Sequence, residues 1–139
     1  MALAVAVFAL LVLALVVSTL LFTAHLEQRA GRSAAEAGRA LEAAEAGLAE
    51  VLAGWDTLTP LHTLSVGDST LLPAIRLDRR SSAGAVVRRM ADHLYLIRAE
   101  GTSRDAAGNV LARRSLVRLA RSGGGIVTPL PQWSWMQVY

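Results

Sequence analysis

The sequence predicts an α+β protein in which one long N-terminal helix packs on a small antiparallel β-sheet. Two observations carry this prediction. Residues 1–24 contain no charge, Pro or Gly. An amphipathic stretch, whose apolar residues recur at helical spacing, follows without a break as far as Gly54. Beyond about residue 60 the pattern changes to short apolar-rich segments separated by turn residues. After the apolar run 115 of the 139 residues remain, which is enough for one small domain.

The apolar run predicts a membrane-spanning helix. A helix rises about 1.5 Å per residue, so 24 residues span roughly 36 Å, more than the hydrocarbon core of a bilayer at about 30 Å. Ala2, Ala6 and Ala9 lie at helical spacing on one face, and small residues let membrane helices approach closely. Packing of this face on another helix and plain contact with lipid both stay open.

The start of the chain differs from a signal sequence, which normally has basic residues before its apolar core. Here the apolar run begins at Met1. Either a basic leader has been removed and Met1 is the mature N-terminus, or Met1 is the initiator. A cleaved secretory signal is disfavoured, because the run is long for such a segment and no small-x-small cleavage site precedes the polar residues.

An amphipathic continuation of the helix is predicted from His25 to Gly54. Gly54 fits a C-cap, so we expect the helix to end at 53–55. The large apolar residues of its stripe should pack on the sheet, because the sheet needs a cover and the stripe is the obvious partner for it. These residues are Leu26, Leu41, Leu48, Leu52 and Trp55.

The head, residues 55–122, should be rich in β-strands. Pro73 indicates that the second strand is an edge strand or is broken. The last two strands read as an antiparallel hairpin whose turn, within Gly101–Asn109, contains Gly108-Asn109. The predicted strands are His62–Val66, Thr70–Leu77, Ala85–Ala91, Leu94–Glu100 and Val110–Arg121.

A glycine joint at 123–125 begins the C-terminal tail, residues 123–139. Two prolines after the joint predict an extended segment, in which Trp133 and Trp135 face the same way. This aromatic, nearly uncharged tail should dock on a surface. The surface is either its own head or a neighbouring molecule.

Charge is distributed unevenly along the chain. Residues 1–54 hold 3 Arg and 5 acids, a net charge of −2, whereas residues 55–139 hold 11 Arg and 6 acids, a net charge of +5. An acidic stalk and a basic head could pair between copies, or the head could lie near an anionic surface. An ordinary solvated surface is the simpler interpretation.

Nothing in the sequence predicts catalysis, a cofactor or a metal. The chain has no Cys, which excludes disulfides, thiolate nucleophiles and Cys-ligated metals. His25, His62 and His93 fall in three different predicted elements, and no HExxH, phosphate loop or nucleophile elbow is present. We therefore expect no enzyme.

Binding of nucleic acid would require several cations on one face. The Arg pairs at 79–80, 88–89 and 113–114 could supply them. On strands, however, each pair would split between the two faces of the sheet. Solvated or ion-paired Arg is therefore the preferred interpretation.

The stalk carries a family resemblance. After the apolar run come LEQRAG at Leu26–Gly31 and LEAAEAGL at Leu41–Leu48. This arrangement resembles the N-terminal helix of type IV pilin-like proteins, in particular PilX-type minor pilins and the related pseudopilins of type II secretion. Tyr95–Leu119 resembles, more loosely, the closing hairpin of such heads.

The resemblance implies a long helix on an antiparallel sheet, removal of a basic leader by a prepilin peptidase, and a methylated N-terminus. It implies anchoring in the bacterial inner membrane, followed by transfer by the pilus assembly machinery into a filament at the cell surface. The partners are other pilin subunits, whose apolar helices replace lipid in the filament core. The residues expected in that core include Met1, Ala2, Val5, Ala6, Phe8, Ala9 and Leu13.

The sequence differs from most pilins at position 5. Most pilins have a glutamate at the fifth mature position, whose carboxylate offsets the amine of an adjacent subunit in an apolar core. This chain has Val5 and no acid before Glu27. The resemblance thus implies a minor or tip-associated subunit. The alternative is a single-pass, membrane-anchored envelope protein whose periplasmic head binds a partner without forming a filament.

Overall fold

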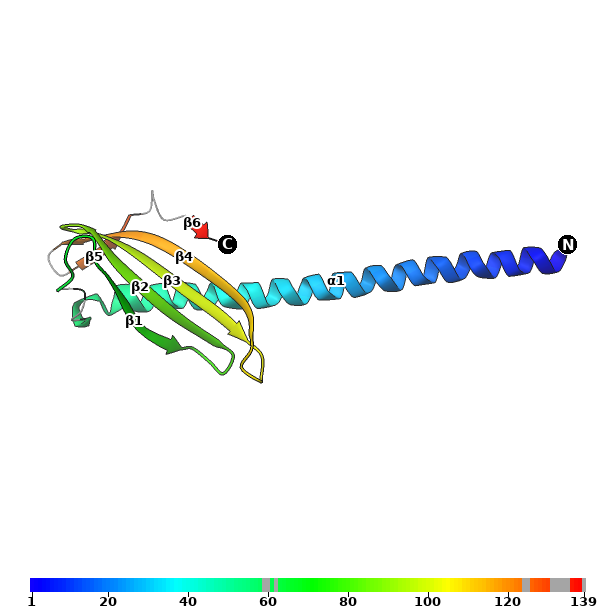
Figure 1. Ribbon diagram of the computed structural model, residues 1–139, viewed down its shortest axis with the longest axis horizontal. Coiled ribbons are helices and arrows are strands. Elements are labelled where there is room, and N and C mark those ends of the chain that lie inside the picture. Colours follow the sequence, from blue (N-terminus) through cyan, green and yellow to red (C-terminus); the bar gives the residue numbers. More distant parts are fainter. Residues whose placement is uncertain (59–60, 62, 124–125, 131–135, 139) are drawn as a thin grey trace. The chain divides into compact units, whose positions relative to one another are not determined.

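The computed structural model describes residues 1–58, 61, 63–123, 126–130 and 136–138. Figure 1 shows one long helix, α1 (Ala2–Ala53), followed by a short 3-10 helix, η1 (Trp55–Thr57), and a β-sheet. The chain divides into two compact units, Met1–Ala35 and Glu36–Tyr139. The strands are β1 (Ser69–Arg76), β2 (Ser81–Ala91), β3 (Leu94–Arg104), β4 (Val110–Gly123), β5 (Ile126–Pro129) and β6 (Met136–Val138).

The first unit is helical from residue 2 onward, and all of its side chains are exposed. The hydroxyl groups in its apolar part bond to the helix itself. Thr19 donates to the carbonyl of Val16 and Thr23 to that of Thr19, each at 2.8 Å. Because the helix satisfies its own polar groups, an apolar medium can surround it at little cost. By length and composition, α1 can cross a membrane.

The second unit confirms the α+β class. The residue 36–53 part of α1 packs on an antiparallel sheet of order β1-β2-β3-β4-β5, in which β6 also pairs with β4. The edge position predicted for the strand that contains Pro73 is confirmed. Its pairing with β2 shifts between Leu72 and Ile75, where proline can supply no ladder hydrogen bond.

The strand predicted at 62–66 is wrong. The described residues 63–66 form turn and loop rather than strand, and Leu61 and Leu64 are both buried in the core. The Arg89 Nη1 atom donates to the carbonyl of Leu64 at 2.7 Å and holds this turn on the sheet. His62 lies outside the described residues.

Strands β2 and β3 are both longer than predicted. Strand β2 begins at Ser81 because the Asp78 carboxylate closes the turn before it, accepting hydrogen bonds from the N–H groups of Arg80 (2.5 Å) and Ser81 (2.6 Å). The pKa of Asp78 is lowered, chiefly by the Arg80 hydrogen bond. Strand β3 continues through Gly101, predicted as part of a turn, to Arg104.

The turn between β3 and β4 is built on Asp105 and Asn109. The Asp105 carboxylate accepts from the Asn109 backbone N–H at 2.8 Å and from its side-chain Nδ2 at 2.9 Å. Gly108 has φ +91°, a conformation that side chains disfavour. The predicted turn chemistry at 108–109 is thus present, with Asp105 as the residue that organises it.

We predict that acid loosens this turn. The hydrogen bonds from Asn109, its side chain first, lower the pKa of Asp105 below the ordinary 3.8. A lowered pKa stabilises the turn above the ordinary value, and this contribution is lost as pH falls from about 4 through the lowered pKa. The protection factor of the Asn109 amide, which is the intrinsic exchange rate at each pH divided by the measured rate, should fall across this window when followed by NMR between pH 6 and 2. Asp105→Asn, which keeps an acceptor oxygen but does not ionise, should remove the pH dependence; a retained dependence would contradict the assignment.

Small residues bring helix and sheet into close contact. The buried helix face begins with Ala40, Ala43, Ala44 and Gly47, and a Cβ on Gly47 would lie 2.7 Å from that of Ala83. A Cβ on Gly101 of β3 would come within 2.0 Å of the Ala40 carbonyl oxygen. Larger side chains fill the core farther along the helix. They include Leu48, Val51, Trp55, Leu61, Leu72, Val87, Tyr95 and Ile97.

Polar groups join the two layers where α1 enters this unit. Ser103, fully buried on β3, donates to the Glu36 carboxylate, which also pairs with Arg39 at 2.8 Å. The buried hydroxyl therefore has a charged partner, and a hydroxyl without a partner would be costly there.

The C-terminal tail continues the sheet, as the extended prediction suggests. Strand β5 pairs with residues 120–123 of β4, and β6 with residues 115–117. Together they form one interrupted strand along β4.

Candidate functional surfaces of the helix and the head

The apolar helix presents a continuous surface without partners inside its own unit. Met1, Val5, Phe8 and Leu13 are each at least 65% exposed. The small residues Ala2, Ala6 and Ala9 are also exposed. Exposed apolar surface of this extent is typical of segments that face lipid or another apolar helix.

The predicted stalk-to-head residues fall into three groups. Leu48 and Trp55 are buried in the core, at 4% and 3% exposure, and Leu52 packs against the core from its margin. Leu41 is only partly buried. Leu26 lies in the first unit and is 49% exposed, so it takes no part in the head core.

The prediction placed Leu48, Leu52 and Trp55 at the sheet correctly, but it did not identify the small residues that pack beside them. Where the helix lies nearest the sheet, alanine and glycine form the contact instead of leucine. Two signals could have indicated this. Ala40, Ala44 and Gly47 repeat at helical spacing, and Gly101 inside a strand marks close backbone approach.

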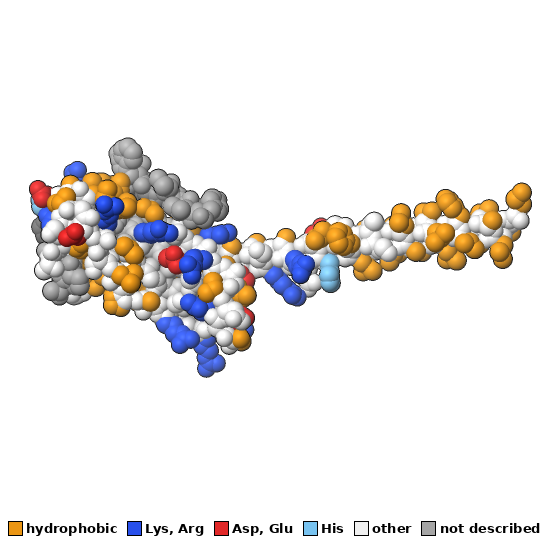
Figure 2. Space-filling view, in the orientation of Figure 1, with side chains coloured by type: hydrophobic (Ala, Val, Ile, Leu, Met, Phe, Trp, Pro, Cys, Tyr) orange, Lys and Arg blue, Asp and Glu red, His pale blue; other side chains and the backbone are white. Residues whose placement is uncertain are grey.

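A basic face lies on the side of the sheet away from the helix. Strand register places Arg88, Arg98 and Arg113 on this side, because Tyr95, Ile97 and Ala99, which alternate with Arg98, are buried against the helix. Figure 2 shows Arg side chains spread over the strands. Among the described strand residues, this face holds six Arg and a single acid, Glu100. The six, called the basic face below, are Arg76, Arg88, Arg98, Arg104, Arg113 and Arg121.

The predicted splitting of the Arg pairs holds for the two that lie on strands. Arg88 is exposed on the basic face, whereas Arg89 bonds to Leu64 and Asp92. Arg113 pairs with Glu100 at 3.3 Å, and Arg114 lies on the opposite side of β4. The splitting does not prevent a basic face, because residues from three neighbouring strands combine on it. Sequence reasoning missed this because register is a property of the assembled sheet.

An acidic ridge runs along the exposed side of α1 in the second unit. Glu42, Glu45 and Glu50 are exposed, and no hydrogen bond or ion pair joins them to the described parts of the chain. Ala49 lies between Glu45 and Glu50, and Ala53 follows Glu50 by three residues; both alanines are exposed. The ridge is defined here as Glu42, Glu45, Ala49, Glu50 and Ala53.

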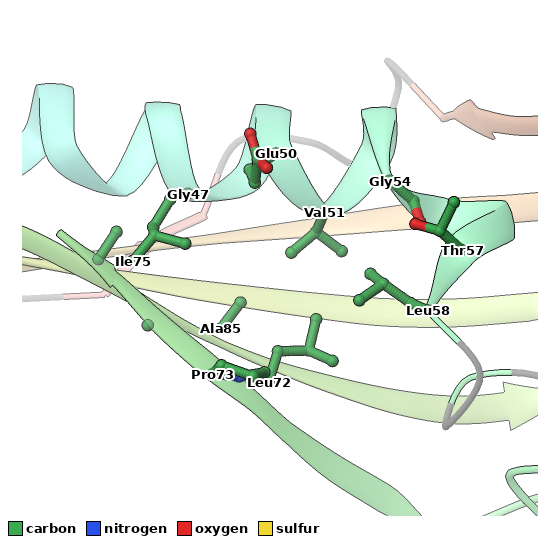
Figure 3. Close-up of a pocket in the computed structure, with 12 residues that line it drawn as sticks. Gly47, Glu50, Val51, Gly54, Thr57, Leu58, Leu72, Pro73, Ile75 and Ala85 are labelled. Atoms are coloured by element: carbon green, nitrogen blue, oxygen red, sulfur yellow. The ribbon is translucent and has the colours of Figure 1, made fainter. Parts of the chain in front are cut away.

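An apolar pocket of about 200 Å³ opens between α1 and strand β1 (Figure 3). Val51 and Leu58 point toward Leu72 and Ala85 across it. The lining holds no pair of groups capable of acid–base or nucleophilic chemistry. The pocket suits an apolar side chain.

Within the described residues, no group of three or more His, Asp or Glu could hold a metal ion. His25 and His93 are both exposed and lie in different units. Trp133 and Trp135, predicted to contact a neighbour or the chain's own head, lie outside the described residues.

Comparison with protein-family models, curated proteins and solved structures finds no match for this chain. The architecture itself is pilin-like: one long apolar N-terminal helix and an antiparallel sheet.

Proposed function

We propose that this chain is a minor or tip-associated structural subunit of a type IV pilus or related filament, assembled through its N-terminal hydrophobic helix. One observation carries the proposal. A single helix, Ala2–Ala53, is fully exposed and apolar in its first part and forms the packed layer of a β-sheet head in its last part. A helix that only anchors a domain in a membrane does not also need to form part of that domain's core.

The physics of assembly supports this function. Moving an apolar helix from lipid to a filament core of other apolar helices costs little free energy. The closeness of helix packing therefore determines whether the helix enters the filament. Ala2, Ala6 and Ala9 provide a small-residue face for such packing. The proposed pathway is insertion in the inner membrane, leader removal by a prepilin peptidase, and incorporation beside other pilin subunits at the cell surface.

Larger side chains on the small-residue face would test whether this face packs on another helix. Ala6→Leu with Ala9→Leu should keep the protein in the membrane, because Leu is more apolar than Ala. It should lower recovery in sheared surface filaments by about tenfold, equivalent to about 1.4 kcal/mol of packing. Ala4→Leu with Ala14→Leu adds the same volume on the opposite helix face and is the matched control. Equal recovery of both double variants would show that this face does not pack on a helix.

The second candidate function is a single-pass anchor whose head binds a partner without a filament. The exposed apolar part of α1 is long enough to cross a membrane, which is all that this candidate requires. Mass spectrometry of the N-terminus separates the two. A methylated Met1 in sheared surface material, behind a genomic leader that ends in Gly, supports the filament; an unprocessed initiator Met confined to the membrane fraction supports the anchor.

A further inference from the structure

We propose that the acidic ridge of one copy docks on the basic face of a second copy, so that heads associate in a directional, head-to-tail manner. This inference rests on the proposed function, because a filament brings subunit heads side by side, and it requires two copies of this chain to be neighbours there. It adds to that function a specific contact between heads. The surfaces involved all belong to the second unit, whose helix and sheet form one packed core.

The basic face has cations available for a partner. Arg98 lies centrally, between Val86 of β2 and Val117 of β4, and no ion pair joins it to the described residues. Arg88 makes a hydrogen bond to the Gly67 carbonyl at 3.2 Å, which leaves its charge without an acid. Val86, Leu96, Val117 and Leu119 are only partly buried between the Arg residues. A partner that covers this face therefore gains apolar contact as well as charge neutralisation.

The acidic ridge complements the face in charge and in shape. No ion pair joins its carboxylates to the described residues, and its alanine side chains project little from the helix. A low helix surface can approach a sheet closely, as Ala40, Ala44 and Gly47 already do on the buried side of the same helix. Glu42 and Glu45, one turn apart, would then reach Arg on neighbouring strands.

The placement of the two surfaces determines the geometry of association. The ridge and the basic face lie on opposite sides of a two-layer unit, so a copy cannot satisfy its own ridge with its own basic face. A contact between two different surfaces is heterologous, and it continues from copy to copy as an open helix or closes as a ring. This outcome suits a filament subunit, whereas a self-complementary patch would stop at a dimer.

Cysteine cross-linking of the full chain provides the first test, since no native Cys interferes. One variant carries Glu45→Cys and a second carries Arg98→Cys. Mixed in membranes of the producing cells under mild oxidation, they should give a disulfide-linked dimer, and each alone should give at least tenfold less. Arg114→Cys, on the opposite side of β4, is the matched control for Arg98→Cys and should not cross-link to position 45.

Charge reversal provides the second test. Glu42→Arg with Glu45→Arg, or Arg88→Glu with Arg98→Glu, should each reduce association in detergent at low salt by about tenfold. The four changes combined should restore it, and added salt should weaken the wild-type contact, because exposed charges are screened over about 10 Å at 0.1 M. Failure of the combined variant to recover, with its fold intact by circular dichroism, would overturn the inference.

A further pair of outcomes separates this inference from the proposed function. Ala9→Cys tests contact between the apolar helices independently of the heads. Cross-links at position 9 without any between 45 and 98 would overturn the head contact and leave the filament proposal standing. Absence of both would overturn the head contact, and recovery of the chain in sheared surface filaments, measured separately, would decide the filament proposal. Retention on heparin that Arg88→Glu with Arg98→Glu abolishes, without cross-links between copies, would instead assign the basic face to a polyanion.

Discussion

Gly101→Ala is expected to separate the helix from the sheet and to destabilise the head severely. A Cβ at this position would lie 2.0 Å from the Ala40 carbonyl oxygen and 2.4 Å from the Ala44 backbone nitrogen. Both atoms belong to helix backbone, which cannot move aside as a side chain can. Because the helix must shift away from a packed sheet, we expect a loss at or above the upper end of the about 1–3 kcal/mol typical of overpacking.

The matched control for this change is Gly84→Ala. Gly84 lies opposite Glu100 on the neighbouring strand, and a Cβ there would meet nothing within 4 Å. Urea unfolding of the full chain in detergent, followed by far-ultraviolet circular dichroism, should give a much lower midpoint for Gly101→Ala and an unchanged or slightly higher one for Gly84→Ala. Equal midpoints would show that the close helix–sheet contact does not determine the stability of the head.

Trp55→Ala is expected to have the second large effect. The Trp55 ring is 3% exposed and meets the Tyr95 ring edge-to-face, with centroids 5.0 Å apart and planes at 79°. Removal of a buried Trp typically costs about 3–5 kcal/mol, and the aromatic pair contributes part of that. For a head with a total stability of about 5–15 kcal/mol, this loss exposes β3 to frequent opening.

Hydrogen exchange measures this opening directly. In Trp55→Ala, the β3 amides around Tyr95 and Ile97 should exchange at least a hundredfold faster than in the wild type at equal pH. Trp55→Phe keeps an aromatic ring against Tyr95 and should recover much of the protection. Wild-type protection in Trp55→Ala would mean that the ring is dispensable to the core.

The sequence predicted most of the head because its local signals are strong. Pro73 indicated an edge strand, and Gly108-Asn109 indicated the turn between β3 and β4. The helix end predicted at 53–55 agrees with Ala53, although Gly54 has φ −88° and the chain leaves through a 3-10 turn rather than a left-handed cap. The strand predicted at 62–66 is wrong, because Leu61 and Leu64 are buried in the core without belonging to a strand. Apolar residues in a short window do not reveal which structure buries them.

The sequence alone determined that a long helix, uncharged over residues 1–24, precedes a basic β-rich head, because membrane length, helical spacing and net charge are properties of neighbouring residues. Only the tertiary structure decided which helix face packs and which side of the sheet collects the Arg residues. The first depends on how closely two backbones approach, which glycine and alanine permit and leucine prevents. The second depends on strand register, which brings together Arg88, Arg98 and Arg113 from three strands.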